Sequence, residues 1–240
     1  MVSLLILKTG STYPTIRQTF GDFEDWFLRH LEGETSLVVR DVTREGPPDS
    51  VTDWQGVVIT GSPAMVTERE PWSEQTAAWL REAVGQDVPV LGVCYGHQLG
   101  AHAFGGRVGF REQGRESGTF QVGLNVDGEQ DPLLGQLPAE FPAHLTHAQS
   151  VLELPAEARL LAWSDGEPHQ AFRLGRHAWG VQFHPEFDER IMRCYLETQS
   201  RDLEGEGQQP ADLLANVRET PQATSLLRRF AHYAHSRNNA

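Results

Sequence analysis

The feature that most constrains the fold is an apolar segment that ends at a cysteine set between two glycines. Residues 88–93 read V-P-V-L-G-V, a pattern typical of a parallel strand that is buried on both faces. Cys94 follows, Gly92 and Gly96 flank it at two-residue spacing, and the next residues predict a helix. This is the spacing of a nucleophile elbow, in which small neighbours avoid a clash beside the strained residue. The segment predicts an α/β sheet carrying a thiol nucleophile, with a buried structural cysteine as the plainer alternative.

A second apolar segment ends in a histidine. Residues 179–186 read W-G-V-Q-F-H-P-E, so that His184 follows a predicted strand and Glu186 comes two residues later. Imidazole accepts a thiol proton near neutral pH, and a carboxylate orients the imidazole. Pro185 constrains the backbone between them, so the two side chains need not point to opposite faces. The chain order Cys94, His184, Glu186 therefore predicts nucleophile, general base and orienting carboxylate, whereas H-P-E alone would indicate a strand exit with a solvated acid.

Together these motifs resemble the class I (triad) glutamine amidotransferases. The resemblance is carried by G-V-C-Y-G-H-Q at 92–98, G-V-Q-F-H-P-E at 180–186 and V-I-T-G-S-P at 58–63. It extends over roughly residues 40–190, with the motifs in the family's order. Within the family, the motifs are most similar to the amidotransferase domain of GMP synthase and its stand-alone relatives.

The resemblance implies a role for each matching residue. Cys94 would attack the side-chain amide of glutamine, release ammonia and leave a γ-glutamyl thioester. His184 would act as the base and then as the acid for the leaving ammonia, while Glu186 fixes its orientation. The backbone N–H groups of Gly61 and Tyr95 would form the oxyanion hole. The residues agree with this assignment, because the residue after an elbow nucleophile supplies one such donor and a glycine lets the backbone approach the oxyanion.

Three further residues are predicted to bind substrate. Gln98 would lie in the glutamine pocket, where an amide both donates and accepts hydrogen bonds. The segment T-H-A-Q-S-V at 146–151 resembles the family's substrate-holding His-Gly-Asp segment, with His147 kept, Ala148 in place of glycine and Gln149 in place of aspartate. His147 is equally well explained as a satisfied polar residue at a strand end.

The remaining pattern predicts a doubly wound, mostly parallel sheet with added antiparallel strands and a helical C-terminal extension. We expect an amidotransferase domain at 1–190 and an extension at 191–240 that packs on the same domain, its apolar stripes facing the core or forming a lid or dimer face. The predicted elements are strands at 3–8, 36–41 and 56–60, helices at 20–31 and 73–84 (capped by Ser73), antiparallel strands at 119–126, 160–163, 170–174 and 178–183, and helices at 190–199, 211–217 and 221–235.

Composition narrows the function classes. A formal charge of −13 argues against nucleic acid as a binding partner. The three arginines that are close to acidic residues in the sequence, Arg107, Arg111 and Arg115, are expected in a solvated loop. The two cysteines and the histidine spacing indicate neither a disulfide nor a metal site, and we expect no cofactor. The apolar run at 1–7 is too short for a signal sequence or membrane span, which favours a soluble cytoplasmic enzyme.

Three functions fit these observations. The chain could be a glutaminase component that passes ammonia to a separate synthetase, since no glycine-rich phosphate loop is recognisable. It could instead be a stand-alone hydrolase of γ-glutamyl amides or peptides. In a third alternative it is a catalytically silent binding or regulatory module, against which the intact set of Cys94, His184 and Glu186 argues. A homo-oligomer is compatible with all three.

Overall fold

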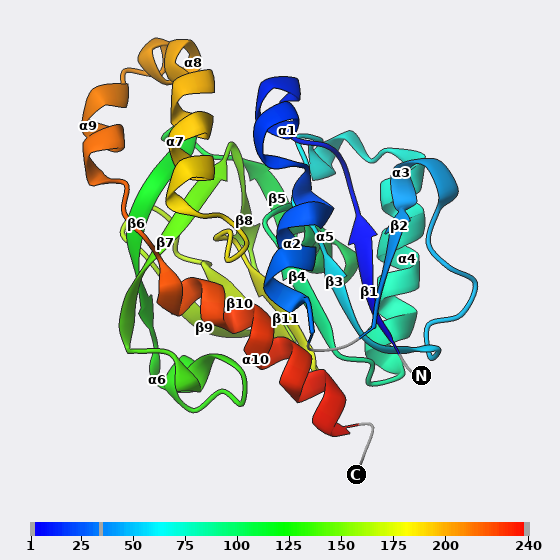
Figure 1. Ribbon diagram of the computed structural model, residues 1–240. Helices are drawn as coiled ribbons and strands as arrows, with labels where there is room; N and C mark the ends of the chain where they lie inside the picture. Colours follow the sequence, from blue (N-terminus) through cyan, green and yellow to red (C-terminus); the bar gives the residue numbers. More distant parts are fainter. Residues whose placement is uncertain (1–2, 34–35, 238–240) are drawn as a thin grey trace.

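The computed structural model describes residues 3–33 and 36–237. The first two residues of the predicted 1–190 domain and the last three of the predicted extension lie outside these ranges. Within them, nine strands form one sheet in the order β2-β1-β3-β4-β11-β10-β9-β6-β7, and β5 pairs with β8 separately (Figure 1). The strands are β1 (Ser3–Lys8), β2 (Leu37–Asp41), β3 (Trp54–Ile59), β4 (Val90–Val93), β5 (Arg107–Phe110), β6 (Glu116–Leu124), β7 (Glu140–His147), β8 (Gln149–Glu153), β9 (Arg159–Trp163), β10 (Ala171–Leu174) and β11 (Ala178–Val181).

Helices cover both faces of the parallel part of the sheet. The helices of the described residues are α1 (Pro14–Phe20), α2 (Phe23–Leu31), α3 (Val42–Glu45), α4 (Pro71–Gly85), α5 (Tyr95–Ala103), α6 (Val126–Glu129), α7 (Glu189–Thr198), α8 (Ser200–Gly205), α9 (Pro210–Asn216) and α10 (Pro221–Arg237), with short 3₁₀ turns at Val66–Glu68 and Leu134–Gln136. Of these, α2 and α10 cover one face of the parallel strands, and α4 and α5 cover the other.

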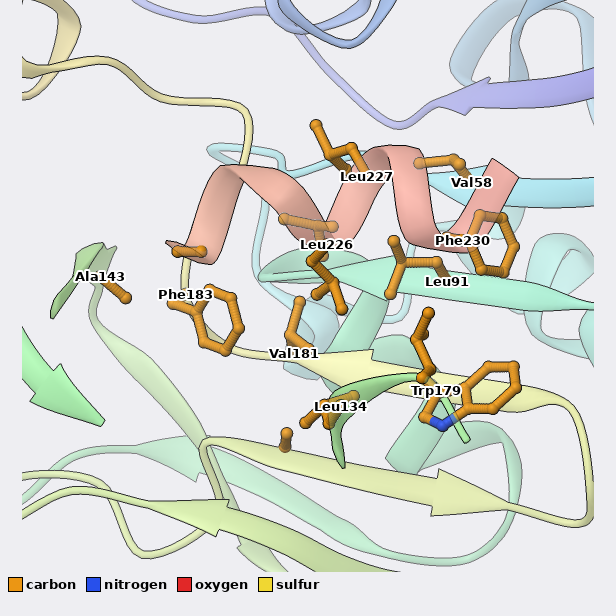
Figure 2. Packing of buried hydrophobic residues seen from close by; sticks show 14 of the residues in the cluster. Val58, Leu91, Leu134, Ala143, Trp179, Val181, Phe183, Leu226, Leu227 and Phe230 are labelled. Atoms are coloured by element: carbon orange, nitrogen blue, oxygen red, sulfur yellow. The ribbon is translucent and has the colours of Figure 1, made fainter. Parts of the chain in front are cut away.

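The alternation of side chains along each strand explains these two layers. In β1, Leu4 and Ile6 join the apolar cluster formed with α2 and α10, whereas Leu5 and Leu7 join the cluster formed with α4 and α5. Figure 2 shows the first cluster, with Leu226 and Phe230 of α10 lying against side chains of the central strands. A sheet covered on both faces needs strands that are apolar at nearly every position, which is the pattern seen in the sequence.

The turn between β4 and α5 is held by close backbone packing. Cys94 has φ 49° and ψ −95°, an unfavourable conformation for a residue with a side chain. A Cβ on Gly92 would lie 2.5 Å from the carbonyl oxygen of Gly96, and a Cβ on Gly96 would lie 2.6 Å from that of Ile59 in β3. Both glycines are therefore required because α5 packs directly on β4 and β3, which confirms the interpretation of this segment as an elbow.

The position of β11 corrects one prediction. The sequence predicts an added antiparallel strand at 178–183, but β11 pairs in parallel with β4, with Val181 opposite Val93. The antiparallel strands are β10, β9, β6 and β7 beyond it. The sequence of a buried strand does not show whether its neighbours run parallel or antiparallel to it, because both kinds of pairing favour apolar side chains there. The parallel register brings the ends of the Cys94 and His184 segments to the same edge of the sheet.

Two helix starts also differ from the prediction. The predicted helix at 20–31 is two helices, because Phe20 ends α1 and Asp22 caps α2 in a capping box with Asp25. The helix predicted to start at Ser73 begins at Pro71, a favoured first helical residue. Ser73 is buried instead, and its hydroxyl lies 2.6 Å from that of Tyr95. The strands β5, β7 and β8 were not predicted.

The C-terminal helices pack on the rest of the chain in two places. Leu226, Leu227 and Phe230 of α10 are fully buried on the central sheet, as the apolar stripe predicted. The helices α7, α8 and α9 form a separate apolar cluster with α1 and the start of α2. Figure 1 shows them above the ends of β6 and β7, beside α1. The division of the chain at residue 190 stays a prediction.

The close packing at the elbow gives a test of stability. Gly92→Ala should lower the free energy of unfolding by about 1–3 kcal/mol, because the new methyl group meets backbone that cannot rotate away. Gly85→Ala is the control, since a Cβ there has no neighbouring atom within 4 Å, and it should be neutral or slightly stabilising. Urea unfolding of both variants measures the difference, and equal midpoints would contradict this account of the turn.

Candidate active site

A pocket of about 290 Å³ lies at the carboxyl ends of the parallel strands. Its walls follow directly after β1, β3, β4 and β11, where a doubly wound sheet places its ligand sites. Six of the predicted site residues line it: Cys94, Tyr95, Gln98, His147, Gln149 and His184. The other two lie directly behind the wall, because a Cβ on Gly61 would be 3.0 Å from His184 and Glu186 bonds to the same imidazole. The structure therefore brings together all eight residues from four separate segments.

His184 is held tightly on three sides. Its Nδ1 lies 2.7 Å from Oε1 of Glu186, and both side chains are almost fully buried. The imidazole lies between two aromatic rings, with ring centroids 4.2 Å from Phe187 and 6.4 Å from Phe23, both nearly parallel to it. Its buried Nε2 bonds to no nitrogen or oxygen atom of the described residues, and the Cys94 side chain lies close to the ring. The ring is thus fixed in orientation, with one nitrogen left available.

The charges around His184 keep it protonated. Burial alone would lower its pKa, but the Glu186 and Cys94 side chains outweigh burial and raise the pKa of His184 to about 10. At neutral pH the ring is therefore an imidazolium, which places a positive charge beside the Cys94 side chain. Nearby His144 behaves in the opposite way, because burial lowers its pKa to about 4 and the positive charge of His184 adds to that effect.

The backbone around Gly61 and Tyr95 is suited to binding an anion. In the described part of the chain, neither backbone N–H group has an internal hydrogen bond. The Gly61 turn is held by Thr9, whose hydroxyl donates to the carbonyl oxygens of Thr60 and Gly61 at 3.0 Å each. A side chain at Gly61 would press on His184, which explains the glycine. Tyr95 begins α5, where the helix dipole favours negative charge.

The predicted substrate-binding side chains are mostly engaged with one another. Gln98 Nε2 donates to the carbonyl oxygen of Gln149 at 2.7 Å and to Oε1 of Gln182 at 3.0 Å. His147 Nδ1 also contacts the Gln149 carbonyl oxygen, at 2.9 Å. Gln149 Nε2 donates to Thr67, while its buried Oε1 has no partner within the described residues. Gln98 and His147 therefore fix the backbone at 149, and Gln149 keeps one free acceptor.

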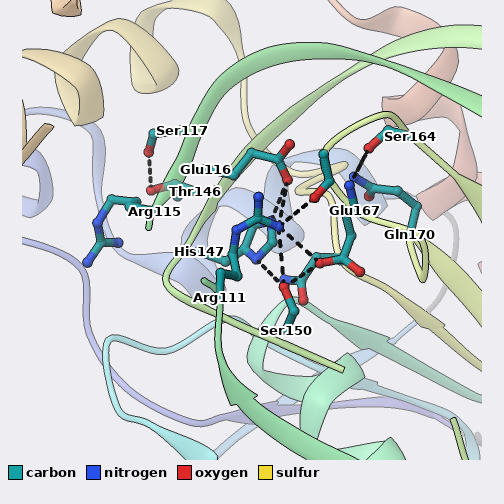
Figure 3. Close-up of polar contacts among 12 residues, drawn as sticks. Arg111, Arg115, Glu116, Ser117, Thr146, His147, Ser150, Ser164, Glu167 and Gln170 are labelled. Carbon is teal, nitrogen blue, oxygen red and sulfur yellow. Dashed lines mark hydrogen bonds and ion pairs between the residues drawn. The ribbon is translucent and has the colours of Figure 1, made fainter. Parts of the chain in front are cut away.

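A buried polar cluster supports this wall of the pocket, and it corrects the prediction of a solvated loop for Arg111. The Arg111 side chain is only 6% exposed and pairs with Glu116 and Glu167 (Figure 3). Glu116 also lies 2.9 Å from Nε2 of His147, its cross-strand partner between β6 and β7. Residue 149 is glutamine where the family's segment has aspartate, and Glu116 brings a carboxylate to His147 from another strand. Only strand pairing places it there.

The pocket also contains residues outside the eight predicted ones, among them Tyr195 of α7, its C-cap residue Gln199, and Arg115, whose Nε is buried rather than solvated. The Tyr195 hydroxyl lies 2.5 Å from that of Thr12, and Gln199 Nε2 donates to Thr146 at 3.0 Å. No local motif marks these residues. Tyr195 and Gln199 reach the pocket through the packing of α7 against α1 and the sheet, and Arg115 reaches it from the loop directly before β6. Arg107 is exposed, as predicted, and pairs with Glu153, but it is the first residue of β5 rather than part of a loop.

Over the described ranges, no group of three or more His, Cys, Asp or Glu side chains could hold a metal ion. No helix within these ranges is long and apolar enough to cross a membrane. Cys94 and Cys194 are both free thiols.

Comparison with known proteins identifies the family. The sequence model of the family "Glutamine amidotransferase class-I" matches residues 28–199. The chain belongs to the class I glutamine amidotransferases. It is 33% identical over 168 residues to a glutamine-hydrolyzing GMP synthase subunit of Halobacterium salinarum, covering 70% of this chain and 83% of that one. It is also 28% identical over 195 residues to gamma-glutamyl peptidase 5 of Arabidopsis thaliana, covering 79% and 77%.

The solved structure of a glutamine amidotransferase from Thermotoga maritima has the same fold, with a TM-score of 0.75 at 22% identity and 97% of each chain covered. This confirms the predicted α/β class with its mostly parallel sheet and added antiparallel strands. The amidotransferase spans only 25% of the full-length GMP synthase of Thermomicrobium roseum, to which it is 38% identical over 143 residues. Its likeness to that enzyme is therefore confined to one part of it.

The charge balance at His184 can be tested by titration. Glu186→Gln removes one of the two side chains that raise the pKa of His184, so the pKa should fall from about 10 and the imidazolium should be lost at lower pH. NMR titration of labelled imidazole nitrogens measures this directly. Glu153→Gln, at an exposed ion pair away from the pocket, is the control and should leave the titration unchanged. An unchanged curve in Glu186→Gln would contradict the assigned cause.

Proposed function

We propose that this amidotransferase cleaves the γ-glutamyl C–N bond of glutamine, with Cys94 as nucleophile, His184 as general acid and base, and Glu186 as the carboxylate that orients His184. The observation that carries the proposal is the buried 2.7 Å contact between His184 and Glu186 beside the strained elbow of Cys94. Membership in the family supports the reaction class.

The reaction divides into two balanced halves. The Cys94 thiolate adds to the γ-glutamyl carbonyl carbon, and the resulting oxyanion accepts hydrogen bonds from the backbone N–H groups of Gly61 and Tyr95. Each such donor stabilises the transition state by about 3 kcal/mol. The C–N bond then breaks, the His184 imidazolium gives its proton to the departing nitrogen, and a γ-glutamyl thioester remains. In the second half, neutral His184 takes a proton from water as the water attacks, which releases glutamate and restores the thiolate–imidazolium pair.

The substrate-binding roles of Gln98, His147 and Gln149 follow from their contacts. Gln98 and His147 both bond to the Gln149 carbonyl oxygen and so act by shaping the wall at 147–149. Gln149 offers a buried acceptor without a described partner, which suits an ammonium or amide donor of the substrate. This division of roles favours Gln149 as the residue of the three that bonds to substrate through its side chain.

Two biological uses of this reaction are compatible with the site. Similarity to a glutamine-hydrolyzing GMP synthase subunit supports a glutaminase that delivers ammonia to a separate synthetase chain. Similarity to a γ-glutamyl peptidase supports a hydrolase that acts alone on γ-glutamyl peptides. The second candidate is favoured by one structural observation, since α7 contributes Tyr195 and Gln199 to the pocket wall. The chain's own C-terminal region thus supplies part of the wall.

The proposed roles can be tested with three variants. Cys94→Ala should abolish release of ammonia from glutamine and of amine from γ-glutamyl peptides, while circular dichroism shows an unchanged fold. His184→Ala should lower kcat/KM by about 10²–10⁴-fold, the usual contribution of general acid–base catalysis. Cys194→Ala is the matched control, because this thiol lies on α7 outside the pocket, and it should keep wild-type activity.

A thiol-reactive glutamine analogue distinguishes the remaining outcomes. Mass spectrometry should find the label on Cys94 and not on Cys194. Turnover of glutamine or peptide by the purified chain would establish a self-sufficient hydrolase. Labelling without turnover would indicate a component that needs a synthetase. Turnover retained in Cys94→Ala, or the absence of both turnover and labelling, would contradict the proposal.

A further inference from the structure

The charge of the pocket is opposite to that of the protein. The whole chain carries a formal charge of −13, with 33 acidic residues against 20 basic ones. Yet among the described residues that line the pocket there is no Asp or Glu, and Arg115 is the one Arg or Lys. A cavity of this kind in an acidic protein favours an anionic ligand, because the local positive charge is not offset within the wall.

Arg115 has no counter-ion in the described structure. Its guanidinium makes no ion pair with any described residue, and its Nε is buried without a hydrogen-bond partner. Neighbouring Arg111 differs completely, since it is paired with both Glu116 and Glu167. Figure 3 shows the Arg115 side chain extending away from that cluster. A buried donor on a charged group without a partner is costly, so a ligand that supplies the acceptor would stabilise it.

The backbone of Arg115 is fixed by the segment after α8. Its N–H donates to Oε2 of Glu206 at 2.5 Å, and its carbonyl oxygen accepts from Gln208 Nε2 at 2.6 Å. Arg111 holds the preceding residue, since its Nε donates to the Gly114 carbonyl oxygen at 3.0 Å. The segment between α8 and α9 therefore anchors the residue at both of its backbone polar groups, which limits the positions that the guanidinium can reach.

We propose that Arg115 binds a carboxylate of the γ-glutamyl substrate and so selects substrates that carry one. This inference rests on the proposed function, which it deepens by assigning the recognition of the substrate's charge. A planar guanidinium with five donors matches a carboxylate in a bidentate arrangement, which a lysine cannot reproduce. Two carboxylates are available in a γ-glutamyl peptide: the α-carboxylate of the glutamyl part and the carboxylate of the leaving amino acid.

Four compounds distinguish these two sources. γ-Glutamylglycine carries both carboxylates. γ-Glutamylglycinamide and glutamine carry only the α-carboxylate of the glutamyl part. The α-amide of γ-glutamylglycine carries only the carboxylate of the leaving glycine. Arg115→Gln should raise KM by about 10–100-fold for every compound that keeps the recognised carboxylate, with little change in kcat. For a compound that lacks the recognised carboxylate, the same substitution should leave KM unchanged, because the interaction that Arg115 makes is already missing. This comparison is a double-mutant cycle between protein and substrate.

Two matched variants control for charge and for folding. Arg115→Lys keeps the charge without the bidentate geometry, so its KM should lie between those of wild type and Arg115→Gln. Arg107→Gln removes an exposed arginine that pairs with Glu153 outside the pocket, and its KM values should equal those of wild type. An unchanged KM in Arg115→Gln, or an equal rise for all four compounds, would overturn the proposal.

Binding measurements separate this inference from the proposed function. In the Cys94→Ala background, calorimetry with γ-glutamylglycine and with glutamate reports affinity without turnover. Affinity that falls about 10–100-fold on adding Arg115→Gln supports the carboxylate site even if the wild-type chain proves inactive. Affinity that is undetectable or independent of Arg115 overturns the site even if Cys94-dependent turnover is found.

Discussion

The packing of α5 on β4 and β3 is the contact on which the site depends. Gly92, Gly96 and the Ile59 carbonyl oxygen lie so close that no side chain fits between helix and sheet. This approach forces the chain to turn within one residue, and Cys94 takes the positive φ that results. The buried strands on either side keep Cys94 in this strained conformation, so its thiol is held rigidly at the start of a helix.

The parallel pairing of β4 with β11 then brings the second part of the site to the first. Because Val181 lies opposite Val93, the residues that follow each strand emerge at one edge. The imidazole of His184 is fixed there by Glu186 and by the rings of Phe23 and Phe187. Burial alone would lower the pKa of His184, but the Glu186 and Cys94 side chains outweigh burial and favour an imidazolium over a neutral ring.

The described polar groups of the pocket wall fall into two kinds. Gln98 and His147 bond to the protein itself and keep the backbone at 149 in place. Arg115 Nε and the Oε1 of Gln149 have no partner among the described residues, which leaves a donor and an acceptor for a ligand. Helix α7 and the segment after α8 complete this arrangement, so the C-terminal helices contribute to the wall as well as to the core.

The sequence by itself determined the elbow, the His184–Glu186 pair and the alternation of strands and helices, because each is encoded within a few neighbouring residues. A glycine at fixed spacing or an apolar run has the same physical meaning wherever it lies. Only the tertiary structure decided that β11 is parallel to β4, that Arg111 is buried with two carboxylates, that Glu116 reaches His147, and that Arg115, Tyr195 and Gln199 line the pocket. These depend on which distant segments meet, and the free energy that chooses among such pairings comes from burial over the whole chain rather than from any local pattern.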